Sequence, residues 1–260
     1  MPFHSGPGPR LYYHVDGHPK RPWLVLGNSL GTDMLMWEPQ MPAFTQHFRV
    51  LRIDTRGHGA SDVPPGDATI EELARDVLGL ADALGIERFA YCGLSLGAMV
   101  GLWLGIHAPR RLDRLVLSNA SAHLPAYESW TLRMQTVRRD GMAALTDAVM
   151  QRFFSQAYRD RDTPFYHSMR ASFEATPAEG YAACCAAVRD ADFRDRLPDV
   201  RVPTLVISGA LDSATPPDPH GHLLHDGIPG AQWAILQTGH IANVEQPETY
   251  AGVTLDFLRG

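Results

Sequence analysis

The sequence predicts an α/β fold: a mostly parallel, doubly wound sheet with helices on both faces and a helical cap inserted after the sixth strand. Short apolar runs alternate with longer stretches of helical periodicity, which is the pattern of strands joined by crossover helices. This alternation is interrupted once, between residues 122 and 198, where no clear strand pattern occurs. A chain of 260 residues fits one such domain with an insertion better than two independent domains.

The predicted strands are short apolar runs bounded by turn residues. The first, at residues 11–15, alternates in polarity and is expected early in the fold, at an edge of the sheet. Central strands are expected at residues 23–26, 50–53, 89–92, 112–117, 204–207 and 233–236. Because these runs are largely apolar, they are typical of parallel strands whose two faces are both covered.

The clearest helix is predicted at residues 70–84. Its apolar positions follow the spacing of one buried helix face, namely Ile70, Leu73, Ala74, Val77, Leu80, Ala81 and Leu84. Thr69 is placed as the N-cap, with Glu72 three residues on, as in a capping box. Gly85 follows the last apolar position and is expected to end the helix in a left-handed conformation.

Residues 122–198 are predicted to form the cap. They are rich in aromatic side chains: Trp130, Phe153, Phe154, Tyr158, Phe165, Tyr166, Phe173 and Tyr181. This is more than one amphipathic face needs, which favours a cap over a simple extension of the core. An insertion after residues 112–117 begins at the carboxyl edge of the sheet and so lies above the place where such folds bind ligands. The expected organisation is a core at 1–121 and 199–260 interrupted by a cap at 122–198.

The composition excludes several classes of partner. A net charge of −6 and a pI near 6.0, with no cluster of Lys or Arg, argue against nucleic acid. No apolar run is long enough to cross a bilayer, so no membrane partner is expected. Residues 1–10 lack a basic segment followed by an apolar core, so no secretory signal is expected.

The three cysteines favour a reducing, cytoplasmic location. Their number is odd and two are adjacent, since they stand at Cys92, Cys184 and Cys185. We expect them to be structural thiols, because the sequence offers none of the electropositive surroundings that activate a nucleophilic cysteine.

The pentapeptide Gly93-Leu-Ser95-Leu-Gly97 is the strongest sign of chemistry. It follows the strand at 89–92 and precedes an apolar helical run, which is the context of a nucleophile elbow. In that turn the backbone is strained and the serine hydroxyl projects above the sheet, while flanking glycines let strand and helix approach. Alone the motif is weak, since small residues also cluster in ordinary turns. In this context Ser95 is the predicted nucleophile.

A serine nucleophile needs a base and an acid that orients the base. Asp212 lies in a turn beyond the strand 204–207, and His240 follows the strand 233–236. Each could instead be an ordinary loop residue, because Asp beside Pro and Gly is common turn chemistry. Their joint occurrence after successive strands, in the order serine, acid, histidine, predicts a catalytic triad with Ser95.

Acyl transfer also needs donors for the oxyanion. One is expected from the backbone N–H of Leu96, and another from the glycine-bounded loop 27–31 after the strand 23–26. Within that loop the N–H of Ser29 is favoured, and Leu30 stays open as an alternative. An ordinary glycine-rich turn is the competing interpretation.

The segment 54–61 also follows a strand, but we assign it to turn stabilisation. Arg56 could pair with Asp54, and His58 is expected to be structural rather than catalytic. The sequence holds no His-Glu-x-x-His or paired Cys/His spacing for a metal and no phosphate-binding glycine loop. No cofactor is therefore required. Ser rather than Asp in the elbow argues against an alkyl-enzyme mechanism.

These motifs resemble those of the α/β-hydrolase superfamily and, within it, the 3-oxoadipate enol-lactonases. The matching segments span nearly the whole chain: 27–31, 54–59, 92–101, 108–119, 180–190 and 240–247. The first three are common to the superfamily, whereas 180–190 and 240–247 are more particular to enol-lactonases. Ala98 departs from the pattern, since relatives often have a second glycine there, but alanine is small enough for little effect.

The resemblance implies a carboxylated enol-lactone as substrate. Ser95 would attack the lactone carbonyl, and the enolate leaving group would become a ketone. The substrate carboxylate should pair with Arg or Lys, and Arg133 is the candidate anchor, with Trp130 as an apolar wall on the same helical face. A solvated surface arginine is the alternative for Arg133. Another carboxylesterase or C–C hydrolase of this fold, or a non-catalytic binding scaffold, remains the alternative function.

Overall fold

One mixed sheet forms the centre of the molecule. The computed structural model describes residues 3–4, 6 and 8–260, so part of the segment 1–10, on which the expectation of no secretory signal rests, lies outside the described residues. Within them the strands are β1 (Phe3–His4), β2 (Leu11–Asp16), β3 (Trp23–Gly27), β4 (Arg49–Ile53), β5 (Phe89–Leu94), β6 (Leu112–Ser118), β7 (Thr204–Gly209) and β8 (Gln232–Leu236).

The strand order of the sheet is β1-β2-β4-β3-β5-β6-β7-β8. Pairing is parallel from β4 to β8, whereas β2 is antiparallel to both β1 and β4. Every predicted strand is therefore confirmed, each to within a few residues. The edge assignment of residues 11–15 is wrong, because the two-residue strand β1 lies outside them. A strand this short carries no periodicity from which it could be predicted.

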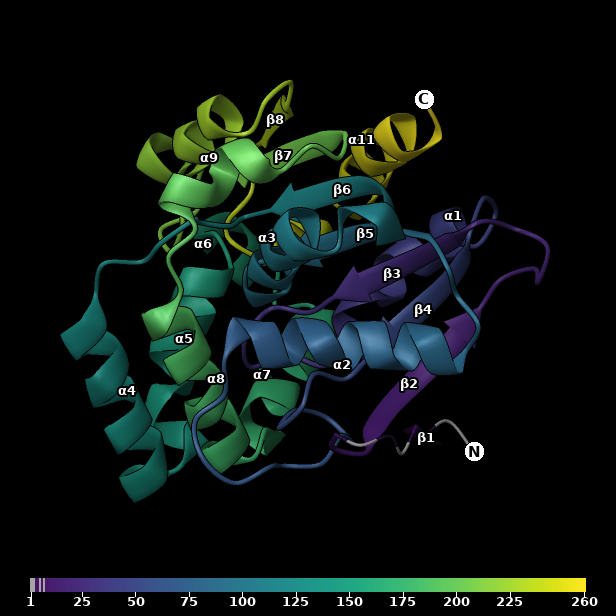
Figure 1. The fold of residues 1–260 in the computed structure, drawn as a ribbon. Coiled ribbons are helices and arrows are strands. Elements are labelled where there is room, and N and C mark those ends of the chain that lie inside the picture. Colours follow the sequence, from purple (N-terminus) through teal and green to yellow (C-terminus); the bar gives the residue numbers. More distant parts are fainter. Residues whose placement is uncertain (1–2, 5, 7) are drawn as a thin grey trace.

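Helices cover both faces of this sheet (Figure 1). α2 and α3 pack side by side on one face, and α1 and α11 lie on the other. The helices are α1 (Met41–Phe44), α2 (Ile70–Ala83), α3 (Leu96–His107), α4 (Tyr127–Asp140), α5 (Thr146–Phe153), α6 (Gln156–Arg159), α7 (Pro164–Ala175), α8 (Ala178–Asp190), α9 (His222–Gly227), α10 (Ala242–Glu245) and α11 (Pro247–Arg259). Shorter helical segments are η1 (Met34–Gln40), η2 (Pro109–Arg111), η3 (Met142–Leu145), η4 (Arg194–Asp199) and η5 (Pro217–Gly221).

The ends of α2 follow from its sequence as predicted. The Thr69 hydroxyl accepts from the Glu72 backbone N–H at 3.2 Å, and a Glu72 carboxylate oxygen accepts from the Thr69 N–H at 2.8 Å. This reciprocal capping satisfies two donors that the first turn of a helix leaves free. After the helix, Gly85 adopts a φ of +67°, which is the left-handed region that glycine occupies without steric cost.

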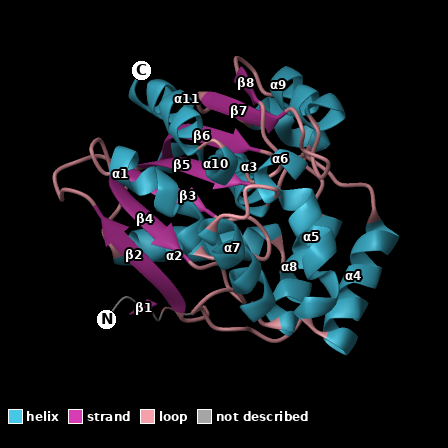
Figure 2. Ribbon diagram, turned by 180° about the vertical axis from the view of Figure 1, so that it is seen from behind, coloured by secondary structure: helices cyan, strands magenta, loops and turns pink. Residues whose placement is uncertain are grey.

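The inserted helices α4 to α8 gather beside the carboxyl ends of the central strands (Figure 2). They contact the sheet domain closely, since Gly180 at the start of α8 lies against Gly57, where a Cβ atom on either residue would meet the backbone of the other. No helix of the described residues is long and apolar enough to cross a membrane. The predicted boundaries of the inserted region at 122 and 198 stay a prediction.

Candidate active site

Ser95 stands at the sharp turn between β5 and α3. Its backbone has a φ of +56° and a ψ of −112°, a conformation that costs a non-glycine residue steric strain. The turn is held by the Ser95 N–H, which donates to the Ser118 carbonyl at 2.9 Å. The side chain is partly exposed between buried neighbours. This is the strained geometry that the elbow motif predicts.

The elbow interlocks with the loop that follows β3. The Gly97 N–H donates to the Asn28 carbonyl at 2.9 Å, and a Cβ on Gly97 would collide with the backbone of Gly27. Asn28 is itself fixed, since its amide donates to the Ile53 carbonyl at 2.7 Å and accepts from the Trp37 indole at 3.0 Å. Glycine at position 97 is thus required by close approach of the loop that would hold the oxyanion.

Asp212 and His240 come together at the carboxyl edge of the sheet. His240 Nδ1 donates to Asp212 Oδ2 at 2.8 Å, and the Asp212 and His240 side chains are 0% and 4% exposed. This contact assigns the proton to Nδ1 in the neutral ring and leaves Nε2 free to act as a base. His240 lines the same cavity as Ser95, although the two loops are far apart in the sequence.

Further donors surround the Asp212 carboxylate. Oδ2 accepts from the Asn119 amide at 3.0 Å and the Thr215 hydroxyl at 2.8 Å, while Oδ1 accepts from the N–H groups of Ala214 and Thr215. Burial alone would raise the pKa of Asp212, but the adjacent His240 and these donors hold it well below its usual range. Asn119 and Thr215 are absent from the sequence prediction. Asn119 directly follows β6, so its place at the strand end was the available sign.

Two candidate oxyanion donors line this cavity with Ser95. Ser29 and Leu30 are both buried. The Ser29 N–H points at the Met36 sulfur at 3.4 Å, a weak acceptor that a charged oxygen can replace. For the Leu30 N–H, no acceptor is found among the described residues. Leu96 is the first residue of α3, so its N–H has no partner within the helix.

The segment 54–61 holds in place the loop 27–31, which carries the candidate oxyanion donors. His58 Nε2 accepts from the Gly31 N–H at 3.0 Å, and Asp54 accepts from the Met34 N–H at 2.9 Å. Burial lowers the pKa of His58 to about 4, so the ring is neutral, and Nδ1 donates to the Arg56 carbonyl at 3.2 Å. His58 is therefore structural, as predicted, and it holds a loop of the candidate site.

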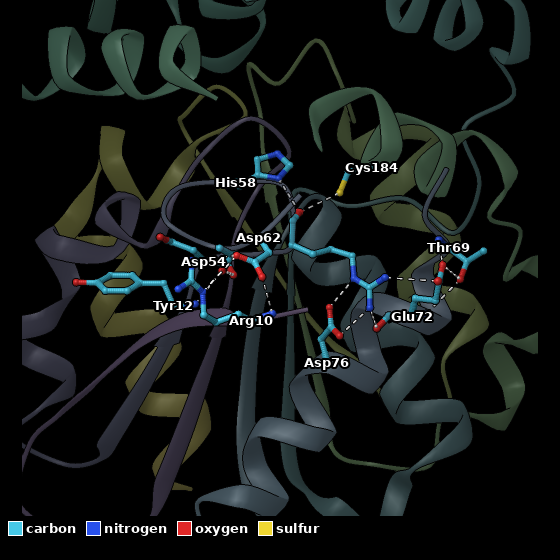
Figure 3. A network of polar contacts seen from close by, with 11 residues as sticks. Arg10, Tyr12, Asp54, His58, Asp62, Thr69, Glu72, Asp76 and Cys184 are labelled. Atoms are coloured by element: carbon cyan, nitrogen blue, oxygen red, sulfur yellow. Dashed lines mark hydrogen bonds and ion pairs between the residues drawn. The ribbon is translucent and has the colours of Figure 1, made fainter. Parts of the chain in front are cut away.

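The expected pairing of Arg56 with Asp54 is wrong. The Arg56 guanidinium bonds to both carboxylate oxygens of Asp76, at 2.6 and 2.7 Å, and lies 3.4 Å from Glu72 (Figure 3). Asp54 instead accepts backbone N–H groups. The acids belong to α2, so this contact between the loop after β4 and a helix could not be derived from neighbours in sequence.

The cavity above Ser95 has a volume of about 400 Å³ and extends under the inserted helices. Trp130 and Arg133 of α4 both line it, as the sequence prediction requires of a wall and an anchor. The Arg133 guanidinium lies 4.9 Å from the centre of the Trp130 ring and donates to the Tyr181 hydroxyl at 3.0 Å. Arg133 is therefore partly buried and lines the cavity, while its role as an anchor stays a prediction.

Arg152 of α5 is a second cation in the cavity and is missing from the prediction. Its side chain is exposed, yet partial desolvation and the nearby Arg133 charge lower its pKa. Among the described residues, neither guanidinium has a carboxylate within ion-pair distance. By contrast, the neighbouring Arg138, Arg139 and Arg189 all bind acidic side chains. Arg152 carries no sequence sign of its own, because its place near Arg133 depends on how the inserted helices are arranged in space.

The cysteines do not take part in the site. Cys92, Cys184 and Cys185 are free and buried, and burial raises the pKa of Cys92 and Cys185 to about 12. They match the structural thiols predicted. Within the described part of the chain, no three His, Cys, Asp or Glu side chains converge to hold a metal ion.

Known proteins resemble the chain over nearly its full length. Residues 22–247 match the family described as alpha/beta hydrolase fold. The 3-oxoadipate enol-lactonase 1 of Acinetobacter baylyi is 35% identical over 97% of this chain and 94% of its own. The putative carbamate hydrolase RutD of Yersinia enterocolitica is 31% identical over 95% of this chain and 92% of its own.

The solved structures agree with this result. The enol-lactonase from Burkholderia xenovorans LB400 superimposes with a TM-score of 0.98 at 43% identity, covering 100% of both chains. The predicted fold class and the resemblance to enol-lactonases are both confirmed. With its mostly parallel sheet, its strained serine and these relatives, the chain belongs to the α/β-hydrolase family.

Proposed function

We propose that this chain is a serine hydrolase that opens the lactone ring of 3-oxoadipate enol-lactone to give 3-oxoadipate. The observation that carries the proposal is a pair of guanidinium groups, Arg133 and Arg152, in the cavity that also holds Ser95 and His240. Neither has an acidic partner in the part of the chain that the structure describes. Arg133 is partly buried and Arg152 is exposed, and because no carboxylate of the described residues occupies either guanidinium, both can pair with an anionic ligand. The named relatives from Acinetobacter and Burkholderia support this substrate class.

The proposed chemistry assigns one role to each group. Ser95 attacks the lactone carbonyl while His240 takes its proton, and Asp212 holds the ring and stabilises its charge. The N–H of Leu96, together with that of Ser29 or Leu30, would bind the oxyanion. The ring oxygen leaves as an enol, which becomes a ketone. Water activated by His240 then releases the product.

Arg133 and Arg152 would hold the substrate carboxylate. A planar guanidinium offers two parallel donors to a carboxylate, and two such groups match an anion better than an uncharged ester. Trp130 supplies an apolar wall beside them and keeps the Arg133 side chain in place. We also propose a cytoplasmic location, because all three thiols are free.

The test is an assay of lactone-ring absorbance with the purified protein. We expect loss of the absorbance on adding enzyme, 3-oxoadipate as the product, and no activity above background in Ser95→Ala. Turnover of simple aryl esters without enol-lactone activity would instead support another carboxylesterase, and the similarity to a putative carbamate hydrolase makes carbamates the next substrates to try. No labelling of Ser95 by an organophosphate would favour a non-catalytic scaffold.

A further inference from the structure

A second histidine lies in the catalytic cavity. His220 belongs to η5, the turn Pro217–Gly221, and is half-buried. It lines the cavity together with Ser95 and His240. The proposed triad chemistry gives it no role, and no motif in the sequence distinguishes it from the other eleven histidines.

The contacts of the Ser121 hydroxyl determine which nitrogen of His220 carries the proton. The Ser121 hydroxyl lies 2.6 Å from the His123 carbonyl, and a carbonyl only accepts, so the single hydroxyl proton is donated there. The same oxygen accepts from the His123 N–H at 3.1 Å and lies 2.8 Å from His220 Nδ1. His220 Nδ1 must therefore be the donor. Burial lowers the pKa of His220, which favours the neutral ring with an unprotonated Nε2.

The proposed reaction needs such a base. When a lactone opens, the leaving oxygen stays tethered to the acyl group, so the new enol can attack the acyl-enzyme and close the ring again. Conversion to a ketone removes this nucleophile. The conversion takes the proton from the enol oxygen and delivers one to the adjacent carbon. At this stage His240 has just protonated the leaving oxygen and must next deprotonate the attacking water. A second base that carries the enol proton would leave His240 free for the water.

We propose that His220 catalyses this enol-to-ketone step, an inference that rests on the proposed function. Nε2 accepts the enol proton as the O–H bond breaks. The resulting imidazolium then donates the Nε2 proton to the carbon next to the enol carbon, where a C–H bond forms. At the same time the C=C bond becomes a single bond and the C–O bond becomes the C=O bond of the ketone. The step is a proton shift within the acyl group, so it consumes no co-reactant and leaves His220 neutral. Ser121 holds the ring in the tautomer that makes Nε2 the base.

His220→Asn is the most direct test. The asparagine amide can still donate to Ser121 in place of Nδ1, but it has no base at the position of Nε2. We expect kcat/KM for the enol-lactone to fall about 100-fold, which is typical for loss of one acid–base group. An aryl ester of similar size should be hydrolysed within about twofold of the wild-type rate, because its phenol leaves by diffusion. His222→Asn, an exposed neighbour, is the matched control and should leave both rates unchanged.

Ser121→Ala provides an independent measurement. Removing the hydroxyl frees the His220 ring to adopt either tautomer, so we expect a smaller loss, of about fivefold, on the enol-lactone alone. An equal fall on both substrates in His220→Asn would show a structural role and overturn the inference, and so would unchanged enol-lactone activity. If the wild-type protein does not open the enol-lactone at all, the proposed function fails first, before any variant is compared.

Discussion

The two sides of the cavity treat their charged groups differently. On the sheet side, Asp212 accepts five hydrogen bonds from the protein, including one from His240. On the side of the inserted helices, Arg133 reaches a single neutral hydroxyl, and Arg152 has no acidic partner among the described residues. The protein itself satisfies the acceptors of the carboxylate on the sheet side, whereas the two guanidinium charges on the helical side are available to a ligand.

This difference indicates a division of labour. A saturated acid is fixed before the substrate arrives, which is what an orienting group for catalysis requires. A guanidinium with no carboxylate within ion-pair distance can bind an anionic ligand without first breaking an ion pair, which is what recognition requires. Changes on the sheet side should therefore affect the rate of turnover, and changes on the helical side should affect substrate affinity.

The largest effect is expected from Asp212→Asn. The amide presents an N–H to His240 in place of an acceptor, so the imidazole is driven toward the tautomer that cannot take the serine proton. We expect kcat to fall about 10⁴-fold with little change in KM, measured by steady-state kinetics. Asp226→Asn, an exposed acid on α9, is the control and should retain full activity. A fall of less than tenfold would show that the carboxylate does not orient the base.

His58→Gln tests the support of the oxyanion loop through the pH dependence of stability. The His58 pKa is about 4 in the folded protein, below its unfolded value near 6.5, so only the unfolded chain gains this proton between those values. Stability is therefore lost as the pH falls from 6.5 to 4, by about 3 kcal/mol. Urea unfolding across this range should show a flatter dependence in His58→Gln. The exposed control His18→Gln should behave as wild type, and an equal slope in all three proteins would contradict the assignment.

Arg133→Ala should act mainly on affinity. Loss of one charged contact is expected to lower kcat/KM for the enol-lactone about 10- to 100-fold, chiefly through KM, while an uncharged aryl ester is little affected. Arg133→Lys should recover part of the loss by restoring the charge. Arg139, on the exposed side of the same helix and paired with Asp140, provides the control variant Arg139→Ala. A change within about twofold would mean that Arg133 is not the anchor.

The smallest effect is expected from Tyr181→Phe. The phenol hydroxyl accepts the only described hydrogen bond of the Arg133 guanidinium, at 3.0 Å. Without it Arg133 keeps its charge and its contact with Trp130 but loses one orienting bond, worth about 1 kcal/mol. KM for the enol-lactone should rise about fivefold at unchanged kcat. A fall in kcat without a rise in KM would place Tyr181 on the catalytic side of the comparison.

The sheet side of the site could be predicted from sequence because each of its residues follows a strand. The carboxyl ends of parallel strands meet at one edge, so Ser95, Asp212 and His240 could be placed together without coordinates. The structure brings Asp212 and His240 into contact and puts both loops on one cavity with Ser95. Arg152 could not be predicted in this way, since its relation to the cavity depends on the packing of one helix on another.

The sequence by itself determined what is local: the strands, the capping of α2 and the strained turn at Ser95, because backbone preferences of a few residues decide them. Tertiary structure alone decided which distant groups meet. It paired Arg56 with Asp76 instead of Asp54. It also formed the hydrogen bonds between Asn119 and Asp212 and between His220 and Ser121. Such contacts depend on how layers pack, and neither spacing nor periodicity along one chain records the distance between layers.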